Sequence, residues 1–339
     1  MRCPMPMASY HKPRGKFIAT GMIIKMNIDL KETIQGVIPA MIACFDEEET
    51  LNEAACRNVA EYLLQYPIGG LYLTGSTGEC FLMNGEERTR NVRVVVNQVK
   101  GRVPVIAHVG GIGTKLSIEY ARAAYQAGAD VLSSVPPFYW KFSEEDILQY
   151  YHDLTAATPL PMLLYNVPLA GSMSLSLLER LADMPSVIGM KFTGKDHDQL
   201  GYLIGRYGDK LNFYSGSDEM ALSGISLGAK GVIGTFYNLM PELYVGIWEM
   251  IQRGQLQQAT RLQKIATEII LECLKYDFIS AIHTMMDWVG VSAGNSRKPF
   301  RKYTHEDLQP LYQKLLDIYR RWDAQEVVFL KNMANRSQG

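Results

Sequence analysis

The stretch Val187-Ile188-Gly189-Met190-Lys191 places a lysine at the end of an apolar run. A short run without polar alternation is typical of a strand that is buried on both faces. A lysine in that position loses its hydration, which disfavours the ammonium and makes the neutral amine available as a nucleophile near neutral pH. The simpler alternative is a lysine that extends its ammonium group to solvent at the edge of the sheet.

Similar apolar runs recur along the chain and alternate with amphipathic segments that have helical periodicity. Eight such repeats over about 220 residues predict an α/β fold of the TIM (β/α)8 barrel type. No GxGxxG motif follows the first strand, which argues against a dinucleotide-binding sheet. The predicted strands are Val37–Cys44, Gly70–Thr74, Val103–His108, Asp130–Val135, Met162–Tyr165, Val187–Lys191, Leu211–Tyr214 and Gly231–Gly234.

Strand patterns end near Pro241, and helical patterns continue beyond it. We therefore expect a barrel that is followed by a C-terminal helical extension. The predicted helices of this part are Glu242–Arg253, Leu256–Lys275, Phe278–Trp288 and His305–Trp322. The expected division is a poorly ordered N-terminal extension (1–32), the barrel with the active site (33–253), a helical bundle (254–325) and a tail (326–339).

Composition excludes several classes of protein. The formal net charge of −1 gives no basic field for nucleic acid, and no apolar stretch is long enough to span a membrane. The five cysteines are irregularly spaced and form no CxxC pair, so we expect neither zinc nor disulfides and favour a reducing cytoplasm. The segment Met1–Lys25 lacks periodicity; a ragged extension is the simpler interpretation, and a transit peptide the alternative.

Two further strand ends carry residues suited to chemistry on a keto acid. Tyr165 ends the strand before Lys191, and neighbouring strands lie about 5 Å apart, so both side chains can reach one substrate. Alone, Tyr165 would more simply be a core tyrosine. Gly75-Ser76-Thr77-Gly78-Glu79 follows the second strand, and its backbone N–H groups and hydroxyls can hold a carboxylate. An ordinary turn is the alternative.

Acidic residues follow the sixth and seventh strands. Asp218 and Glu219 would repel phosphate and favour a polyhydroxyl ligand, or they cap a helix. Asp196-His197-Asp198 offers metal-ligating side chains, but adjacent positions converge poorly on one ion. We therefore expect a solvated helix start there and no metal site.

These motifs, in this order, resemble the pyruvate-dependent class I aldolases, the family of N-acetylneuraminate lyase and dihydrodipicolinate synthase. The resemblance extends from about Ile34 to Tyr319. The matching stretches are GSTGE (75–79), IAHVG (106–110), PPFYW (136–140), YNVP (165–168), GMKFT (189–193), SGSDE (215–219), GVIGTFYN (231–238) and SRKPF (296–300).

The resemblance implies a TIM barrel with C-terminal helices that assembles as a homotetramer. It implies that Lys191 forms the Schiff base and that Tyr165 shuttles protons. Ser76 and Thr77 would bind the pyruvate carboxylate. Tyr139 would enter a neighbouring subunit's site and complete a hydroxyl relay through Ser76. The covalent imine at Lys191 would replace any metal or organic cofactor.

Family members differ in the aldehyde that condenses with pyruvate. The synthase carries an arginine two residues past YNVP, where this chain has Ala170. Lyases carry an Asp-Glu pair that binds sugar hydroxyls, matched here by Asp218 and Glu219. Thr193, Gly216 and Thr235 also match lyase substrate positions, although Thr235 replaces the usual serine.

The implied activity is reversible cleavage of a 2-keto acid sugar, N-acetylneuraminate, into pyruvate and N-acetylmannosamine. The alternatives within the family are dihydrodipicolinate synthase, a 2-keto-3-deoxy sugar-acid aldolase and a dehydratase. Two further alternatives are a metal-dependent aldolase and a barrel that binds a ligand without catalysis.

Overall fold

A computed structural model describes residues 30–336 of the chain. The first 29 residues of the predicted N-terminal extension, like the last three of the predicted tail, lie outside the described residues. The described part starts with a short helix, α1 (Leu30–Thr33). No helix in residues 30–336 is long and apolar enough to cross a membrane.

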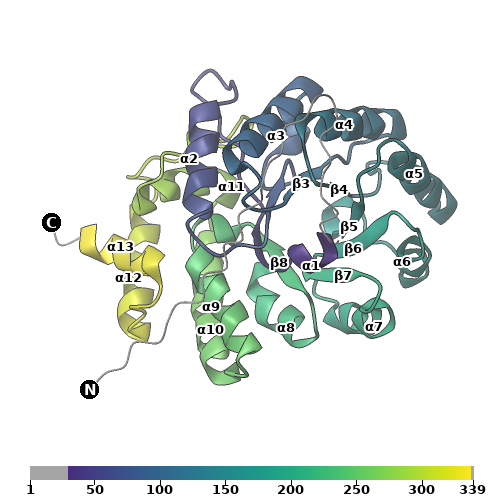
Figure 1. Cartoon of the computed structure of the whole chain (residues 1–339). Coiled ribbons are helices and arrows are strands. Elements are labelled where there is room, and N and C mark those ends of the chain that lie inside the picture. The colour runs from purple at the N-terminus through teal and green to yellow at the C-terminus, as the bar shows by residue number, and fades with distance from the viewer. Residues whose placement is uncertain (1–29, 337–339) are drawn as a thin grey trace, which may run out of the picture.

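Eight parallel strands form a nearly closed barrel, which confirms the predicted fold (Figure 1). All of the predicted strands are present, with ends that differ by a few residues. From β2 to β8 each strand pairs with its neighbours in sequence, and β1 pairs with β8. A bridge between Ala40 and Tyr72 joins the remaining edges. The strands are β1 (Gly36–Pro39), β2 (Leu71–Leu73), β3 (Val105–His108), β4 (Val131–Ser134), β5 (Met162–Asn166), β6 (Val187–Phe192), β7 (Asn212–Ser215) and β8 (Gly231–Gly234).

The strands are apolar because both of their faces are covered. Inward side chains such as Ile38, Ile106 and Ile233 fill the barrel interior. Outward side chains such as Leu71 and Leu73 pack against the surrounding helices. Burial on both sides explains why the sequence shows continuous apolar runs rather than alternation. At one end of the barrel, α1 lies across the opening (Figure 1), and the Tyr214 hydroxyl donates to the Ile34 carbonyl at 2.8 Å.

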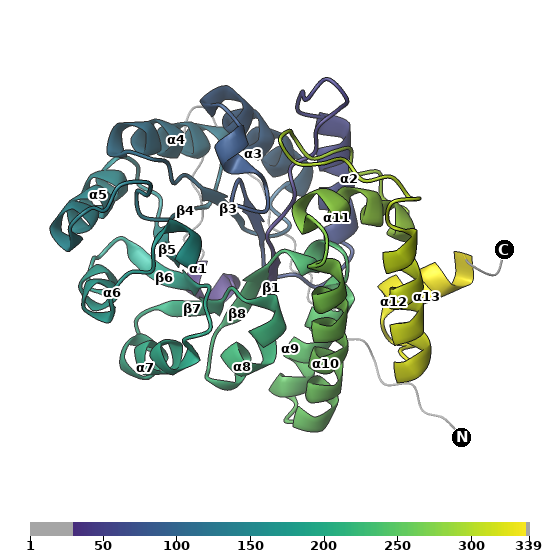
Figure 2. The same ribbon diagram turned by 180° about the vertical axis from the view of Figure 1, so that it is seen from behind.

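A ring of helices surrounds the barrel, with one or more helices after each strand (Figures 1 and 2). Their starts follow local capping rules. Asn84 and Glu87 form a reciprocal capping box at α3, and Ser143 and Asp146 form another at α5. The helices of the ring are α2 (Glu53–Leu63), α3 (Gly85–Val99), α4 (Thr114–Ala127), α5 (Glu144–Ala156), α6 (Leu175–Ala182), α7 (His197–Tyr207) and α8 (Ala221–Ser226).

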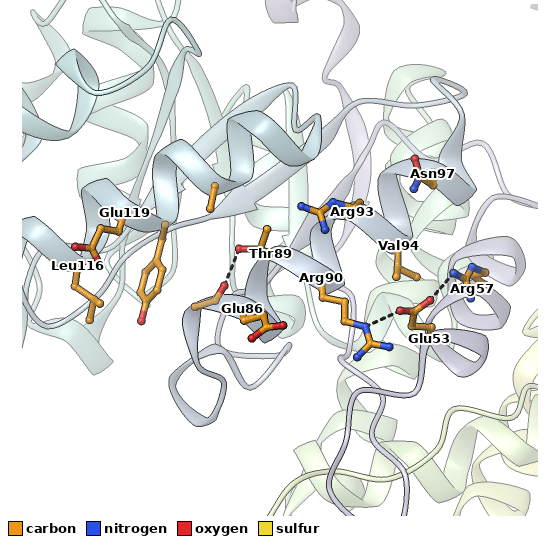
Figure 3. Close-up of a pocket in the computed structure, with 13 residues that line it drawn as sticks. Glu53, Arg57, Glu86, Thr89, Arg90, Arg93, Val94, Asn97, Leu116 and Glu119 are labelled. Carbon is orange, nitrogen blue, oxygen red and sulfur yellow. Dashed lines mark hydrogen bonds and ion pairs between the residues drawn. The ribbon is translucent and has the colours of Figure 1, made fainter.

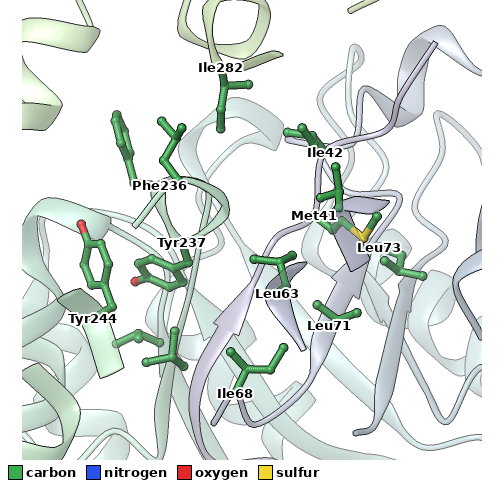
Figure 4. Packing of buried hydrophobic residues seen from close by; sticks show 14 of the residues in the cluster. Met41, Ile42, Leu63, Ile68, Leu71, Leu73, Phe236, Tyr237, Tyr244 and Ile282 are labelled. Carbon is green, nitrogen blue, oxygen red and sulfur yellow. The ribbon is translucent and has the colours of Figure 1, made fainter. Parts of the chain in front are cut away.

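The C-terminal helices pack against one side of the barrel (Figures 1 and 2). Figure 4 shows part of the contact, where Tyr244 and Ile282 of the C-terminal helices belong to one buried cluster with Met41 and Leu63. The helices are α9 (Pro241–Gln252), α10 (Leu256–Cys273), α11 (Phe278–Met286), α12 (Gln309–Trp322) and α13 (Val328–Arg336).

The segment expected as a tail contains α13. Phe329, Leu330 and Met333 are buried on one face of this helix. Its first turn is held from a distant helix, since the backbone N–H of Phe329 donates to the Glu242 carboxylate of α9 at 3.0 Å. Burial against other helices therefore stabilises α13, although this helix is short.

Candidate active site

Lys191 lies on β6 one residue from its end, and its side chain is buried at 4% exposure. In the sheet register, Lys191 is the partner of Tyr165 on β5 and of Tyr214 on β7. Its Nζ atom lies 4.3 Å from the centre of the Tyr165 ring and 4.6 Å from the centre of the Tyr72 ring. The amine therefore meets two aromatic faces instead of bulk water, and these faces attract a cation.

Tyr72 is a component of this cluster that the sequence did not single out. It belongs to β2, and its ring centre lies 6.1 Å from that of Tyr165. Its hydroxyl donates to the Ser133 hydroxyl of β4 at 3.0 Å. Alternation within the predicted strand Gly70–Thr74 was the available signal, since it directs Tyr72 opposite to Leu71 and Leu73.

The GSTGE segment follows β2 as a tight loop. The Thr77 hydroxyl is within 2.7 Å of the Thr235 hydroxyl, which follows β8. The loop after β2 therefore contacts the loop after β8. Ser76 is exposed, whereas Thr77 is buried. Glycine is required at Gly75, because a Cβ there would lie 2.6 Å from the Tyr72 ring.

Thr193 and Gly216 lie directly beside Lys191. A Cβ at Gly216 would lie 1.9 Å from the Thr193 hydroxyl and 3.1 Å from Lys191 Cε, so only glycine fits. The Thr193 hydroxyl is buried and has no hydrogen-bond partner in residues 30–336. A buried polar atom without a partner, at the mouth of the barrel, is suited to a hydrogen bond with a ligand.

Asp218 and Glu219 differ in their surroundings, although they are adjacent. Asp218 is buried and accepts a hydrogen bond from the Phe236 N–H at 2.7 Å. Burial raises the pKa of Asp218 to about 7, although backbone N–H groups and the charge of Lys191 oppose that shift. Glu219 is exposed. One carboxyl group is thus engaged with the β8 loop, and the other is free to meet a ligand.

Tyr139 is not part of the buried cluster within one chain. Its side chain is 84% exposed, and its ring contacts Trp140 at 4.8 Å between centres. Its backbone has a φ of 86°, in the left-handed region that side chains rarely adopt. Within one chain, the contacts join Lys191 to Tyr165 and Gly216, and Thr77 to Thr235, whereas Tyr139 is exposed.

His108 is packed inside the protein, and Asp196-His197-Asp198 lies at the start of α7. The buried His108 ring donates from Nδ1 to the Thr74 carbonyl and accepts from the Val135 N–H at Nε2. Burial lowers its pKa to about 3, so the ring is neutral. Residues 30–336 contain no group of histidine, cysteine or acidic side chains that could hold a metal ion.

A groove of about 640 Å³ lies elsewhere, between α2, α3 and α4 on the outside of the barrel (Figure 3). Glu53 bridges Arg57 and Arg90 there, each at 2.6 Å. None of the predicted site residues lines this groove. It is a charged surface feature distinct from the cluster around Lys191.

The fold and site define an enzyme of the (β/α)8 class, with a buried lysine and tyrosine at the carboxyl ends of adjacent strands. The profile of the dihydrodipicolinate synthetase family matches residues 33–318, so the chain belongs to that family. It is an aldolase of this family, a carbon–carbon lyase of the class I type.

Several relatives match over most of their length. The N-acetylneuraminate lyase of Escherichia coli (strain SMS-3-5 / SECEC) is 35% identical over 291 residues, covering 84% of this chain and 97% of that protein. The N-acetylneuraminate lyase of Rhizobium meliloti (strain 1021) is 32% identical and covers 84% of this chain and 95% of that protein. A catalytic lysine mutant of the Ruminococcus gnavus sialic acid aldolase is 30% identical with a TM-score of 0.81, covering 86% of this chain and 98% of that one.

Proposed function

We propose that this chain cleaves N-acetylneuraminate reversibly into pyruvate and N-acetylmannosamine through an imine at Lys191. The observation that carries the proposal is the buried Lys191 amine between the faces of Tyr165 and Tyr72. Burial limits hydration of the amine, and the adjacent phenol supplies a group for proton transfer. The names of the matched relatives support the choice of substrate.

The proposed reaction begins when the loop at Ser76 and Thr77 holds the carboxylate of the open-chain sugar acid. Lys191 attacks the ketone, and loss of water gives a protonated imine. Tyr165 takes the proton of the C4 hydroxyl as its own phenolic proton passes to the hydroxyl relay through Ser76 and the Tyr139 of a neighbouring subunit. The C3–C4 bond breaks with its electron pair moving to the imine nitrogen. The aldehyde sugar leaves, the enamine gains a proton at C3, and water releases pyruvate from Lys191.

The remaining site residues would contact the sugar. The Thr193 hydroxyl, which has no partner in residues 30–336, and the exposed Glu219 carboxylate are suited to sugar hydroxyls. Asp218 would act with them from its buried position, while Gly216 leaves room beside Lys191 and Thr235 steadies the loop through Thr77. We propose that no metal or organic cofactor takes part.

Oligomerisation completes the proposal. The exposed Tyr139 supports a homotetramer in which this tyrosine enters a neighbouring subunit's site. The free thiols of Cys44, Cys56, Cys80 and Cys273 fit a cytoplasmic, reducing environment.

Dihydrodipicolinate synthase activity is the main alternative within the family. Ala170 occupies the place of the arginine that would bind the carboxylate of aspartate semialdehyde. It belongs to the short helical turn Pro168–Ala170 after β5. A methyl group there offers no charge for that carboxylate, so we expect turnover of aspartate semialdehyde to be negligible.

The deciding experiment is borohydride trapping with pyruvate and with N-acetylneuraminate, read by intact mass and peptide mapping. We expect a reduced adduct on Lys191 from both compounds. Lys191→Ala should lose the adduct and all measurable turnover while keeping the fold. Lys195→Ala, which removes an exposed lysine after the same strand, is the matched control and should behave as wild type.

An adduct from pyruvate alone would retain the imine and reject the sugar, and aspartate semialdehyde would then be tested as its partner. Turnover by Lys191→Ala above a percent or so of wild type would overturn the imine mechanism. Activity lost on chelation would instead favour a metal-dependent aldolase.

A further inference from the structure

A buried glutamate and a buried histidine face each other where the β2 loop meets the C-terminal helices. Glu79 ends the GSTGE segment, and His283 belongs to α11. Glu79 Oε1 and His283 Nε2 are 3.6 Å apart, with the two side chains 0% and 2% exposed. Neither atom has a hydrogen-bond partner among residues 30–336.

The other polar atoms of the two side chains already have partners. His283 Nδ1 lies 3.1 Å from the Ala293 carbonyl, and a carbonyl only accepts, so Nδ1 carries a proton. Glu79 Oε2 accepts from the Arg297 backbone N–H at 2.8 Å. Oε1 and Nε2 are thus left to satisfy each other.

Without a proton between them, two lone pairs would face each other in a dry interior, and both groups would remain unsatisfied. One proton removes the conflict. It can reside on Glu79, whose acid O–H then donates to Nε2, or on His283, whose N–H then donates to the carboxylate. Either arrangement leaves the pair with no net charge.

We propose that Glu79 and His283 share one proton and that this contact fastens the carboxylate-binding loop to the C-terminal helices. The pair would be positioning residues for pyruvate, an inference that rests on the proposed function. The neighbouring ionisable groups that interact with Glu79 are the Arg297 guanidinium and the Cys44 thiol. Arg297 is itself engaged by both carboxylate oxygens of Glu87, at 2.6 and 2.9 Å.

The contact reaches the loop through two backbone hydrogen bonds. The Glu79 N–H donates to the Ser76 carbonyl at 3.0 Å, and the Cys80 N–H donates to the Gly75 carbonyl at 3.2 Å. Glu79 has a φ of 51°, a conformation that a non-glycine residue keeps only when its surroundings hold it. A displacement of Glu79 therefore displaces Ser76.

The test compares His283→Leu, His283→Gln and Glu79→Gln in the full chain, with pyruvate as the probe and borohydride trapping on Lys191 as the readout. We expect His283→Leu to raise the half-saturating pyruvate concentration about tenfold, since it leaves Glu79 unsatisfied. Trapping at saturating pyruvate should change little. Each glutamine variant supplies an amide N–H at the shared position and should recover most of the binding.

His305→Leu is the matched control. His305 forms a similar pair with Asp287 at 3.4 Å in the same extension, but both side chains are exposed. This variant should bind pyruvate as wild type does. An unchanged half-saturation in His283→Leu, or a loss in Glu79→Gln as large as in His283→Leu, would overturn the proposal.

Thermal unfolding provides a second test that does not depend on enzyme activity. A shared proton predicts a lower midpoint for His283→Leu and recovery in His283→Gln. If the unfolding midpoint of Glu79→Gln lies several degrees above that of wild type, the native contact lacks the shared proton. That result would refute the proposal. If wild type traps no pyruvate at any concentration, the proposed function fails, and these midpoints alone decide whether the proton is shared.

Discussion

The chemistry of Lys191 depends on what replaces water around its amine. Burial removes most of the hydration of an ammonium group, at a cost of several kcal/mol when nothing compensates. Cation–π contacts with the faces of Tyr165 and Tyr72 each offset about 0.5–2 kcal/mol of this cost. The two rings therefore offset part of the cost of burying the Lys191 amine.

Tyr165→Phe tests the role of the hydroxyl without removing the ring. We expect kcat for the proposed lyase reaction to fall about 10²- to 10⁴-fold, because the proposed general base is lost. The pyruvate adduct on Lys191 should still form. Steady-state kinetics and trapping separate the two effects.

Tyr72→Phe is the matched variant, because it changes the other ring that faces Lys191. Its hydroxyl bonds to Ser133, so we expect a much smaller loss. Equal losses in both variants would contradict the assignment of proton transfer to Tyr165.

At the residue scale, polarity and position in a pattern were sufficient to find Lys191 and Tyr165. Each is a polar side chain at the end of an apolar strand. Tyr72 lies inside a strand, where tyrosine is ordinary, so its contact with the amine depends on barrel closure. Glu79 and His283 are far apart in sequence, and no local pattern pairs them.

Among the elements, α13 is attached in part through a buried carboxyl group. Glu242 of α9 accepts from the Phe329 N–H, and burial raises the pKa of Glu242 to about 7. Its second oxygen has no partner in residues 30–336. Ionisation of Glu242 is thus unfavourable in the folded protein because of burial, although the Phe329 N–H opposes that shift.

Glu242→Gln should stabilise the protein at pH 8 and have little effect near pH 4.5. The folded pKa of about 7 exceeds the unfolded value of 4.5, so native stability falls as pH rises between them. The neutral amide avoids this loss, which amounts to about 3 kcal/mol. Thermal unfolding at both pH values measures it.

Glu249→Gln is the control, because Glu249 is an exposed residue of the same helix that pairs with Arg253. It should shift the unfolding midpoint little at either pH. A stabilisation by Glu242→Gln of equal size at pH 4.5 and pH 8 would rule out ionisation as its cause.

The elements that the sequence predicted best are those with local signals. The sequence shows helical patterns at Gly85–Val99 and Glu144–Ala156, and α3 and α5 have these bounds, because each helix starts after a capping residue. In contrast, α13 has a short apolar face, and its first turn is satisfied by a residue 87 positions away. Local patterns do not report such partners.

For the whole molecule, the barrel brings distant strand ends to one opening. Thr77 and Thr235 are 158 positions apart in sequence and in hydrogen-bond contact. Tyr139 instead points outward. The proposed site is complete only if a second subunit supplies this tyrosine.

Subunit mixing tests that arrangement. Tyr139→Phe should lower kcat about a hundredfold, since the proposed proton relay would be broken. Tyr125→Phe, at another exposed tyrosine, should not lower it. Mixed assemblies of Tyr139→Phe and Lys191→Ala should regain activity, because the intact Tyr139 of one chain serves the intact Lys191 of the other.

Activity assays on the separate and co-expressed variants, with oligomer size measured by light scattering, provide the readout. Mixed oligomers that remain inactive would show that Tyr139 does not act across subunits.

The sequence by itself determined the eight-strand barrel, the C-terminal helices and the placement of Lys191 and Tyr165 at strand ends, because these follow from local periodicity and from motif order. The tertiary structure alone decided that Tyr72 faces the amine, that Gly216 must lack a side chain, and that Glu79 meets His283. These contacts join residues from different strands and helices, and only closure of the barrel and docking of the C-terminal helices bring them within reach.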